Sequence, residues 1–289
     1  MPFCLWFTGI PAAGKTTLAL ETIKQLQSVG VSCSLVDADP IRRHIYPDLG
    51  FSEGDRAKNI ERLASIASLV LRGGGNACVA AVSPYREARK AALQSIGPSA
   101  IELHVHCSKE EAARRDPARK YWASADAYEP SSDSIVLDTM ARPSEELGTD
   151  ILSLLREGGL IPSKGTLFIG RWSPFHMGHK HIIDEAMKEG SVVIGVRATP
   201  LTKDDPWTPA ETVQMIRAVY PSTYVFICPD ISALAVGRTP GYELKSHIPG
   251  EDITKISGTE VRELIASNDP RWRDAVPSEV MRYLKKRLL

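Results

Sequence analysis

The sequence lacks any run of apolar residues long enough to cross a bilayer, and it has no excess of charge of either sign. Lysine and arginine together number 35, as do aspartate and glutamate, so the formal net charge is zero. This balance gives no indication of binding to nucleic acid or to a membrane surface. No basic segment followed by an apolar one precedes the first strand-like run, so we expect no signal peptide and a cytoplasmic location.

Cysteine is also scarce, with five among 289 residues and none in a C-x-x-C pair. The cysteines are scattered, mostly in apolar strand-like runs, which favours buried thiols in a reducing compartment over disulfides or metal ligands. They are Cys4, Cys33, Cys78, Cys107 and Cys228.

A phosphate-binding motif stands near the start of the chain. Gly9, Gly14, Lys15 and Thr16 fit the P-loop spacing G-x-x-x-x-G-K-[ST], between an apolar run and a stretch with helical periodicity. Glycines let backbone N–H groups turn toward phosphate oxygens, and the following helix presents its positive N-terminus to the same anion. We expect Lys15 to reach the β- and γ-phosphates and the Thr16 hydroxyl to hold Mg²⁺. The residues predicted to bind the nucleotide here are Gly9, Ala12, Ala13, Gly14, Lys15, Thr16 and Thr17.

Two carboxylates, Asp37 and Asp39, follow the next strand-like run. The carboxyl end of a strand beside a P-loop strand is where α/β sheets bind ligands. At least one of the pair is therefore expected to accept the proton of a substrate hydroxyl or to orient Mg²⁺. A structural role is compatible with this one, with Asp39 as a helix N-cap and Pro40 in the first helical position.

The rest of the first half has weaker signals. A helix is expected over 53–71, with Arg56, Asn59 and Arg62 along one side of it. Ser83 follows a continuous apolar strand at 77–82, again at the edge where ligands bind. A basic group predicts a lid over nucleotide phosphates, although it also suits a solvated face. That group is Arg114, Arg115, Arg119 and Lys120.

Together these segments resemble the adenylylsulfate (APS) kinase family over residues 1–157. The matching segments are Gly9 to Thr17, Asp37 to Ser52, Asp55-Arg56 with Asn59-Ile60, Ser83 to Arg86, and Arg115-Asp116-Pro117. The resemblance implies a P-loop kinase that uses ATP and Mg²⁺ to phosphorylate the 3′-hydroxyl of adenosine 5′-phosphosulfate. It also implies that Asp37 contacts that hydroxyl and the metal, and that Asp39 belongs to the substrate site. The acceptor contacts that it implies are Arg42, Arg56 and Asn59 at the 5′-phosphoryl end, Phe51 as one wall around the base, and Ser83.

The chain departs from this family at two places. The family's Asp-Gly-Asp-Asn is Asp37-Ala38-Asp39-Pro40 here, and a shorter segment, 118–123, replaces the family's lid. Related kinases act on cytidine nucleotides that carry other groups. The departures therefore leave the acceptor base and its 5′ substituent open.

A Gly- and Pro-rich stretch at 158–165 marks a domain boundary, and a new strand at 166–170 leads into a second motif. His176 and His179 form H-x-G-H at a predicted loop-to-helix junction, where Gly178 allows a phosphate to approach the backbone. Two imidazoles there can donate hydrogen bonds to an α-phosphate under attack. A zinc site would need further ligands nearby, and the sequence offers none.

The segment Ile256-Ser257-Gly258-Thr259 with Arg262 completes the pattern, because Ser257 or Thr259 can cap a helix that faces β- and γ-phosphates. With H-x-G-H, it resembles the nucleotidylyltransferase superfamily over 165–289. The motifs are most similar to archaeal-type nicotinamide-mononucleotide adenylyltransferases and ATP sulfurylases, whereas the short length is nearer to small cytidylyltransferases. ATP is thus the first expectation for the nucleotide and CTP the second. The nucleotide-binding residues implied are Gly170, Arg171, His176, Gly178, His179, Ser257, Gly258, Thr259 and Arg262, with Arg197 and Lys203 at the acceptor and 237–242 near the base or acceptor.

The sequence as a whole predicts an α/β protein of two domains, 1–160 and 165–289, each a doubly wound parallel sheet. We expect a bifunctional transferase in which the second domain makes a nucleotide and the first phosphorylates its 3′-hydroxyl. Its partners would be ATP, a second nucleotide and a small anionic acceptor, with no nucleic acid and no membrane, and the kinase resemblance suggests a homodimer. Alternatives are a cytidylyltransferase joined to a kinase of cytidine-diphosphate derivatives that makes a phosphoramidate-type nucleotide, a nicotinamide-mononucleotide adenylyltransferase fused to an unrelated kinase, and a non-catalytic nucleotide sensor.

Overall fold

The computed structural model describes residues 2–118, 123–202, 205–233, 243, 245 and 256–288. Lys203, the segment 237–242, and Arg119 and Lys120 of the predicted lid lie outside the described residues. The chain divides into two compact units, Met1–Leu155 and Arg156–Leu289, and each is described by itself.

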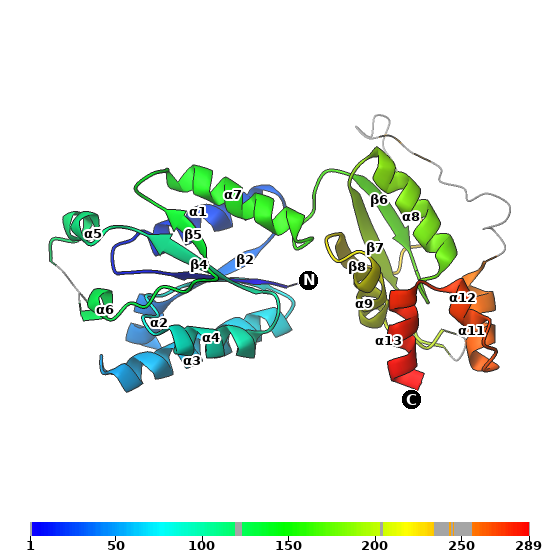
Figure 1. The fold of residues 1–289 in the computed structure, drawn as a ribbon, viewed down its shortest axis with the longest axis horizontal. Helices are drawn as coiled ribbons and strands as arrows, with labels where there is room; N and C mark the ends of the chain where they lie inside the picture. Colours follow the sequence, from blue (N-terminus) through cyan, green and yellow to red (C-terminus); the bar gives the residue numbers. More distant parts are fainter. Residues whose placement is uncertain are drawn as a thin grey trace. The chain divides into compact units, whose positions relative to one another are not determined.

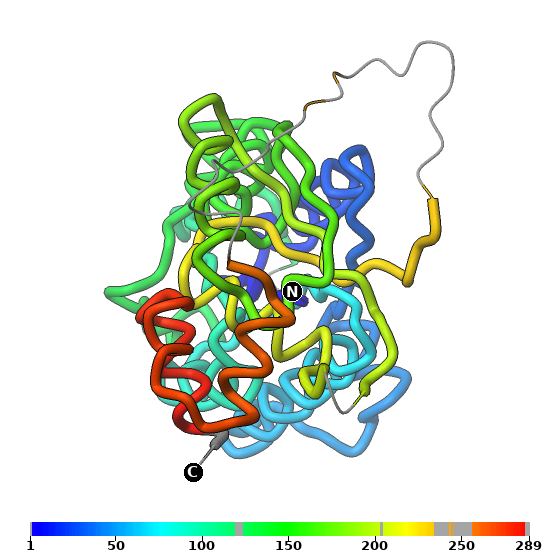
Figure 2. The backbone as a smooth tube through the Cα atoms, turned by 90° about the vertical axis from the view of Figure 1, so that its right-hand side faces the viewer, coloured from blue at the N-terminus to red at the C-terminus, as the bar shows by residue number. Residues whose placement is uncertain are grey.

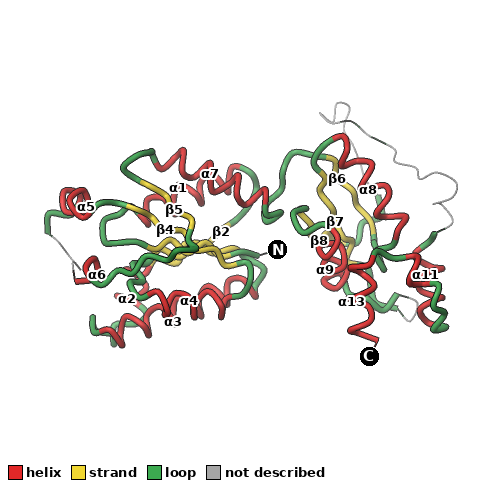
Figure 3. The backbone as a smooth tube through the Cα atoms, in the orientation of Figure 1, coloured by secondary structure: helices red, strands yellow, loops and turns green. Residues whose placement is uncertain are grey.

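The first unit is built on a parallel sheet of five strands in the order β2-β3-β1-β4-β5. Figure 3 shows the strands of this unit in yellow, with red helices on both sides of them. The central strand β1 is buried along its whole length, as its apolar sequence predicts. Because the strands are parallel, the P-loop, Asp37 and Ser83 all emerge at one edge of the sheet. The strands are β1 Cys4–Thr8, β2 Cys33–Asp37, β3 Asn76–Ala80, β4 Ala100–His106 and β5 Ile135–Asp138.

Helices cover both faces of this sheet. Figure 1 shows α1 and α7 on one face and α3 and α4 on the other. The face under α3 holds a cluster of small and branched side chains, including Leu63, Ala67 and Val79. The helices are α1 Lys15–Ser28, α2 Ala38–His44, α3 Glu53–Arg72, α4 Arg86–Ile96, α5 Lys109–Arg115, α6 Ala123–Asp126 and α7 Ser144–Glu157.

The start of α2 differs from the sequence interpretation. The cap is Asp37, whose side chain accepts a hydrogen bond from the backbone N–H of Asp39 at 3.0 Å. Asp39 is therefore inside the helix, and Pro40 is its third residue rather than its first. Both aspartates suit an N-cap, but the chain turns directly at the end of β2, so the first of them takes the role.

The second unit contains a parallel sheet in the order β6-β7-β8 within the part of the chain that the structure describes. Helix α8 packs on β7, α9 packs on β7 and β8, and α13 packs on α9. The last helices, orange to red in Figure 2, are gathered beside one another. The elements are β6 Thr166–Gly170, α8 Met177–Glu189, β7 Val192–Ala198, α9 Pro209–Val219, β8 Tyr224–Pro229, α11 Gly258–Ala266, α12 Trp272–Ala275 and α13 Ser278–Leu288.

The architecture is mixed α/β with parallel sheets, as the sequence predicts. Within the described residues, none of the helices combines the length and the apolar character needed to cross a membrane. The five cysteines are free thiols, and Cys4, Cys78 and Cys107 are buried.

Candidate functional site

The P-loop has the backbone that its glycines predict. Gly9 has φ 147°, and a Cβ there would lie 2.3 Å from the carbonyl oxygen of Val105, so any other residue would collide with β4. Gly14 has φ 97° and immediately precedes α1, which begins at Lys15. The N-terminal N–H groups of α1 therefore border the loop, as an anion site requires.

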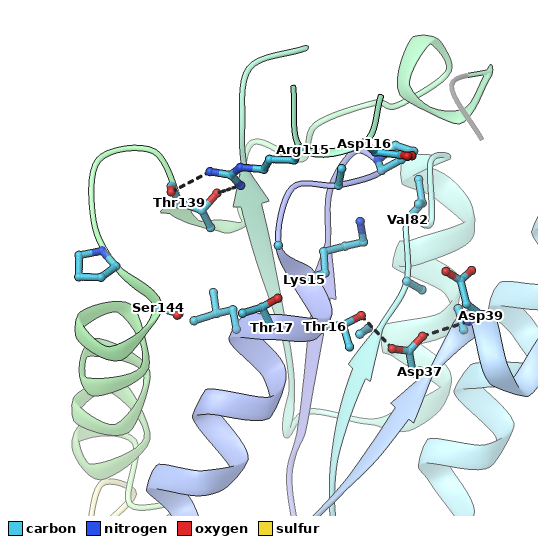
Figure 4. A pocket seen from close by; sticks show the side chains of 18 of the residues that line it. Lys15, Thr16, Thr17, Asp37, Asp39, Val82, Arg115, Asp116, Thr139 and Ser144 are labelled. Carbon is cyan, nitrogen blue, oxygen red and sulfur yellow. Dashed lines mark hydrogen bonds between the residues drawn. The ribbon is translucent and has the colours of Figure 1, made fainter. Parts of the chain in front are cut away.

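Lys15 extends into a cavity of about 740 Å³ at the edge of the sheet (Figure 4). Its Nζ donates to the carbonyl oxygen of Ile10 at 2.7 Å. Burial lowers the pKa of the Lys15 amine to about 8, although the negative charges of Asp39 and Asp37 act to raise it. Phosphates entering this cavity would meet a cation that has little competing solvent around it.

The structure brings the two predicted metal-binding groups together. The Thr16 hydroxyl donates to Asp37 Oδ2 at 2.8 Å, and both line the same cavity. A hydroxyl and a carboxylate beside a phosphate site are the oxygen ligands that Mg²⁺ prefers, so these residues fit the ion. No group of three or more His, Cys, Asp or Glu side chains suited to a metal occurs among the described residues.

The opposite wall of this cavity contains a residue that the sequence analysis missed. Thr139, directly after β5, donates through its hydroxyl to the carbonyl of Ala13 at 2.9 Å and accepts from Arg115 Nη1 at 3.0 Å (Figure 4). Thr139 therefore ties the P-loop to Arg115, which belongs to the predicted basic lid. The position of Thr139 directly after a strand, where α/β sheets bind ligands, was the feature of the sequence that could have indicated it. Arg114 instead pairs with Glu111 and does not line the cavity.

A smaller cavity of about 60 Å³ adjoins the first and contains the predicted acceptor residues. Asp39 lines both cavities, whereas Asp37 lines only the larger one. The smaller cavity is lined by Asp39, Arg42, Phe51, Arg56, Asn59 and Ser83, together with Ser124.

The aromatic wall of the smaller cavity is bordered by two guanidinium groups. The Arg42 guanidinium carbon lies 4.2 Å from the centroid of the Phe51 ring, and that of Arg56 lies 5.7 Å from it. Arg56 also donates to the hydroxyl of Ser124. Arg62, which the sequence placed on the same side of α3, instead pairs with Asp48 at 2.9 Å and does not line this cavity.

In the second unit, His176 is the N-cap of α8. Its Nδ1 accepts from the backbone N–H of Gly178 at 3.1 Å and of His179 at 3.4 Å, and the two imidazole rings stack with centroids 3.6 Å apart. A neutral ring whose Nδ1 accepts carries its hydrogen on Nε2, where it can donate to an anion. Burial, with Arg262 nearby, lowers the pKa of His176 to about 4, and burial lowers the pKa of His179 as well. Both rings are therefore neutral at pH 7.

The two motifs of this unit meet although they are far apart in the sequence. Arg262 of α11 donates to the carbonyl of Ser173 at 2.6 Å and to the Thr259 hydroxyl at 3.0 Å. Ser257, one of the two predicted caps, caps α11 by accepting from the N–H of Glu260. A Cβ at Gly258 would lie only 3.2 Å from the Ser173 carbonyl oxygen, so this close approach depends on glycine.

The other predicted residues of this unit lie around the strand ends. Arg171 Nη1 lies 3.7 Å from Oδ2 of Asp205. The other oxygen of this buried carboxylate, Oδ1, accepts a hydrogen bond from the Ser173 hydroxyl at 2.5 Å. Arg197, the second-to-last residue of β7, forms an ion pair with Asp230, which lies just beyond β8. Gly170 ends β6 against the ring of Trp172.

Two family models match separate stretches of the chain. Residues 1–128 match the family model described as adenylylsulphate kinase, and residues 167–235 match the one described as cytidylyltransferase-like. Both descriptions name transferases, the class of enzyme that the motifs predict.

The individual relatives match similar shares of this chain, but the chain covers very different shares of each relative. The adenylyl-sulfate kinase of Synechococcus sp. (strain JA-3-3Ab) is 33% identical over 169 residues, covering 54% of this chain and 96% of that protein. A probable bifunctional SAT/APS kinase of Sorangium cellulosum is 35% identical over 175 residues, covering 56% of this chain but only 30% of that protein. Among solved structures, the protein designated APE1195 aligns with a TM-score of 0.50 at 30% identity, covering 54% of this chain and 95% of that one.

Proposed function

The N-terminal unit of this chain belongs to the adenylylsulphate kinase family, and from that premise we propose that it transfers the γ-phosphoryl group of ATP to the 3′-hydroxyl of adenosine 5′-phosphosulfate. The observation that carries this proposal is the position of Asp39 between two adjoining cavities. One cavity has the P-loop lysine, and the other has the arginines and the aromatic wall expected around an acceptor nucleotide. A phosphoryl group would pass between them at this carboxylate.

The surroundings of the two aspartates support a division of roles. Asp37 is held by the Thr16 hydroxyl on Oδ2 and by the N–H of Asp39 on Oδ1, which suits a metal ligand of fixed orientation. Asp39 reaches the acceptor cavity and would take the proton of the attacking hydroxyl. Mg²⁺ held by Thr16 and Asp37 would neutralise charge on the phosphates, and Lys15 would orient them.

For the acceptor, we propose that Arg42 and Arg56 bind the anionic 5′ end and that Phe51 stacks on the base. Asn59 and Ser83 complete this cavity. An acceptor that lacks the anionic 5′ group would leave both guanidinium groups without their ligand.

For the C-terminal unit, we propose transfer of a nucleotidyl group from a nucleoside triphosphate to a small anionic acceptor, with release of pyrophosphate. The neutral His176 and His179 rings would donate from Nε2 to the α-phosphate as charge develops on it. Arg262 and the N-terminus of α11 would bind the departing phosphates. ATP is the first candidate nucleotide, and the kinase unit would then consume the product.

A second candidate is a pair of reactions based on CTP. The match of residues 167–235 to the cytidylyltransferase-like family favours it. The replacement of the kinase family's Asp-Gly-Asp-Asn by Asp37-Ala38-Asp39-Pro40 is consistent with a different acceptor.

The two candidates differ in the product they form. The whole chain, Mg²⁺ and inorganic pyrophosphatase would be incubated with ATP alone or with ATP and CTP, each with sulfate, phosphoamino acids or nicotinamide mononucleotide. Mass spectrometry should detect an adenosine product with sulfate that carries a further 3′-phosphate. A doubly modified cytidine product would favour the second candidate, and the absence of any nucleotidyl product would contradict the coupled reaction.

A further inference from the structure

A buried arginine that the proposed reaction does not use lies beneath the acceptor cavity. Arg89 of α4 is completely buried. Each of the N–H donors of its guanidinium has an acceptor, so none is left unsatisfied. The bonds are Nε to Glu102 Oε1 at 3.0 Å, Nη1 to the carbonyls of Ser83 at 2.6 Å and Pro84 at 3.1 Å, and Nη2 to the Ser131 hydroxyl at 2.9 Å and the Glu129 carbonyl.

Apart from Glu102 of β4, these acceptors come from two segments that border the acceptor cavity. The first, residues 81–85, is here called the acceptor loop, and Ser83 and Pro84 of this loop line the cavity. The second, residues 123–131, is here called the arm, and its Ser124 lines the cavity and accepts from Arg56. Arg89 therefore donates hydrogen bonds to the acceptor loop and to the arm at the same time.

The loop and the arm also bond directly to each other. The N–H of Glu129 donates to the Pro84 carbonyl at 2.9 Å, and the Glu129 carboxylate accepts from the N–H of Arg86 at 2.8 Å. Ser83 is held in a left-handed conformation, with φ 45°, and its hydroxyl accepts from the Trp6 indole at 3.2 Å. Because the Pro84 carbonyl accepts from both Glu129 and Arg89, the position of the arm depends on the guanidinium.

Only arginine can make this set of bonds. A lysine ammonium has three donors on one atom, so at least two of the five hydrogen bonds made by residue 89 would be lost. Glu102 balances the buried charge and accepts a second hydrogen bond from the Ser131 hydroxyl at 2.8 Å, which closes the network.

We propose that Arg89 is a positioning residue for acceptor binding, which joins the acceptor loop to the arm and so sets the distance between Ser83 and Ser124 across the cavity. The proposal rests on the proposed kinase function. It predicts a selective effect on the acceptor, because among the described residues Gly9–Thr17 of the P-loop form no hydrogen bond with Arg89 or with its acceptors. The acceptor loop does contact Thr8, the residue before the P-loop, whose hydroxyl donates to the Val82 carbonyl at 2.8 Å.

The test compares the full chain with Arg89→Lys, Ser131→Ala and Glu102→Gln variants. Lys90→Gln is the matched control, since Lys90 is the next residue of α4 and is exposed. Steady-state kinetics give KM for adenosine 5′-phosphosulfate and for ATP separately. Hydrogen exchange of the backbone amides of the arm and of α1 gives a second readout, which needs no activity.

We expect Arg89→Lys to raise KM for adenosine 5′-phosphosulfate about 10-fold or more while KM for ATP stays within about 2-fold. In this variant the backbone amides of the arm should exchange faster, whereas those of α1 should exchange at an unchanged rate. Ser131→Ala should give smaller changes of the same kind, and Lys90→Gln should give none. Equal rises in both KM values, or unchanged arm exchange and unchanged acceptor KM, would overturn the proposal. If Arg89→Lys does not fold, Ser131→Ala and Glu102→Gln decide by the same criteria. If the wild-type chain does not phosphorylate this acceptor, the proposed function fails, but arm exchange still decides the role of Arg89.

Discussion

Asp37 and Asp39 are two positions apart, but their carboxylates have different surroundings. Asp37 caps α2 and accepts from Thr16, whereas Asp39 lines the boundary between the two cavities. Removing one negative charge at a time should therefore affect different steps of the proposed reaction.

We expect Asp39→Asn to lower kcat of the kinase reaction by about 10²- to 10³-fold, because the amide cannot accept the hydroxyl proton. Asp37→Asn should instead raise the Mg²⁺ concentration for half-maximal rate, since asparagine keeps the cap but loses the charge. Kinetics at several Mg²⁺ concentrations distinguish the two effects. A shared Mg²⁺ dependence in both variants would contradict the division of roles.

The buried His176 should make the stability of the second unit depend on pH. The pKa of His176 falls from about 6.5 to about 4 on folding, mainly through burial. Between these values the unfolded chain binds more protons than the folded one, so stability decreases as pH falls through this window. The difference corresponds to roughly 3 kcal/mol at most.

Urea denaturation between pH 7.5 and pH 4.5 should therefore give a decreasing free energy of unfolding for the second unit. His176→Asn should reduce this slope, because asparagine keeps an N-cap acceptor but does not titrate. A slope that is the same in the variant would show that other groups dominate.

The start of α8 depends on a glycine between the two histidines. A Cβ at Gly178 would lie 3.0 Å from His176 Cε1 and 3.3 Å from the Ile256 carbonyl oxygen. Gly178→Ala should therefore displace the cap and lower nucleotidyl transfer by about 10-fold or more, while kinase activity is retained. Gly190→Ala at the other end of α8 is the control, because nothing lies within 4 Å of its Cβ. Equal rates in the two variants would count against this role of Gly178.

Elements whose signals are local could be predicted from the sequence. Ser52 caps α3, so the helix expected over 53–71 starts where the sequence predicts. The prediction that Asp39 caps α2 was wrong, because Asp37 is the cap. Both residues are good caps and they lie two positions apart, so only the position where β2 ends decides between them.

The parts of the site that sequence reasoning missed depend on contacts between distant segments. Ser124 accepts from Arg56 across 68 positions, and Arg89 donates to Ser131 across 42 positions. Neither residue stands in a motif. A lone serine or arginine in a helix has no pattern that indicates its partners, so only the fold reveals them.

At the scale of the whole molecule, we propose two phosphate-binding sites of different construction, one in each compact unit. If each unit holds its own site, Lys15→Ala should lower phosphorylation by about 10³-fold and leave nucleotidyl transfer unchanged. His176→Ala should do the reverse. Measuring both half-reactions with supplied substrates tests this, and unchanged turnover in both variants would favour a nucleotide sensor.

If ATP binds at Lys15 as proposed, the lowered pKa of this amine should couple ATP binding to proton uptake. With a pKa of about 8, about half of the free molecules lack this proton at pH 8. Bound phosphates favour the ammonium form, so complex formation at that pH should take up about half a proton from the buffer. Binding heats measured in phosphate and in Tris should therefore differ at pH 8 and converge at pH 6.5, where the amine already carries its proton.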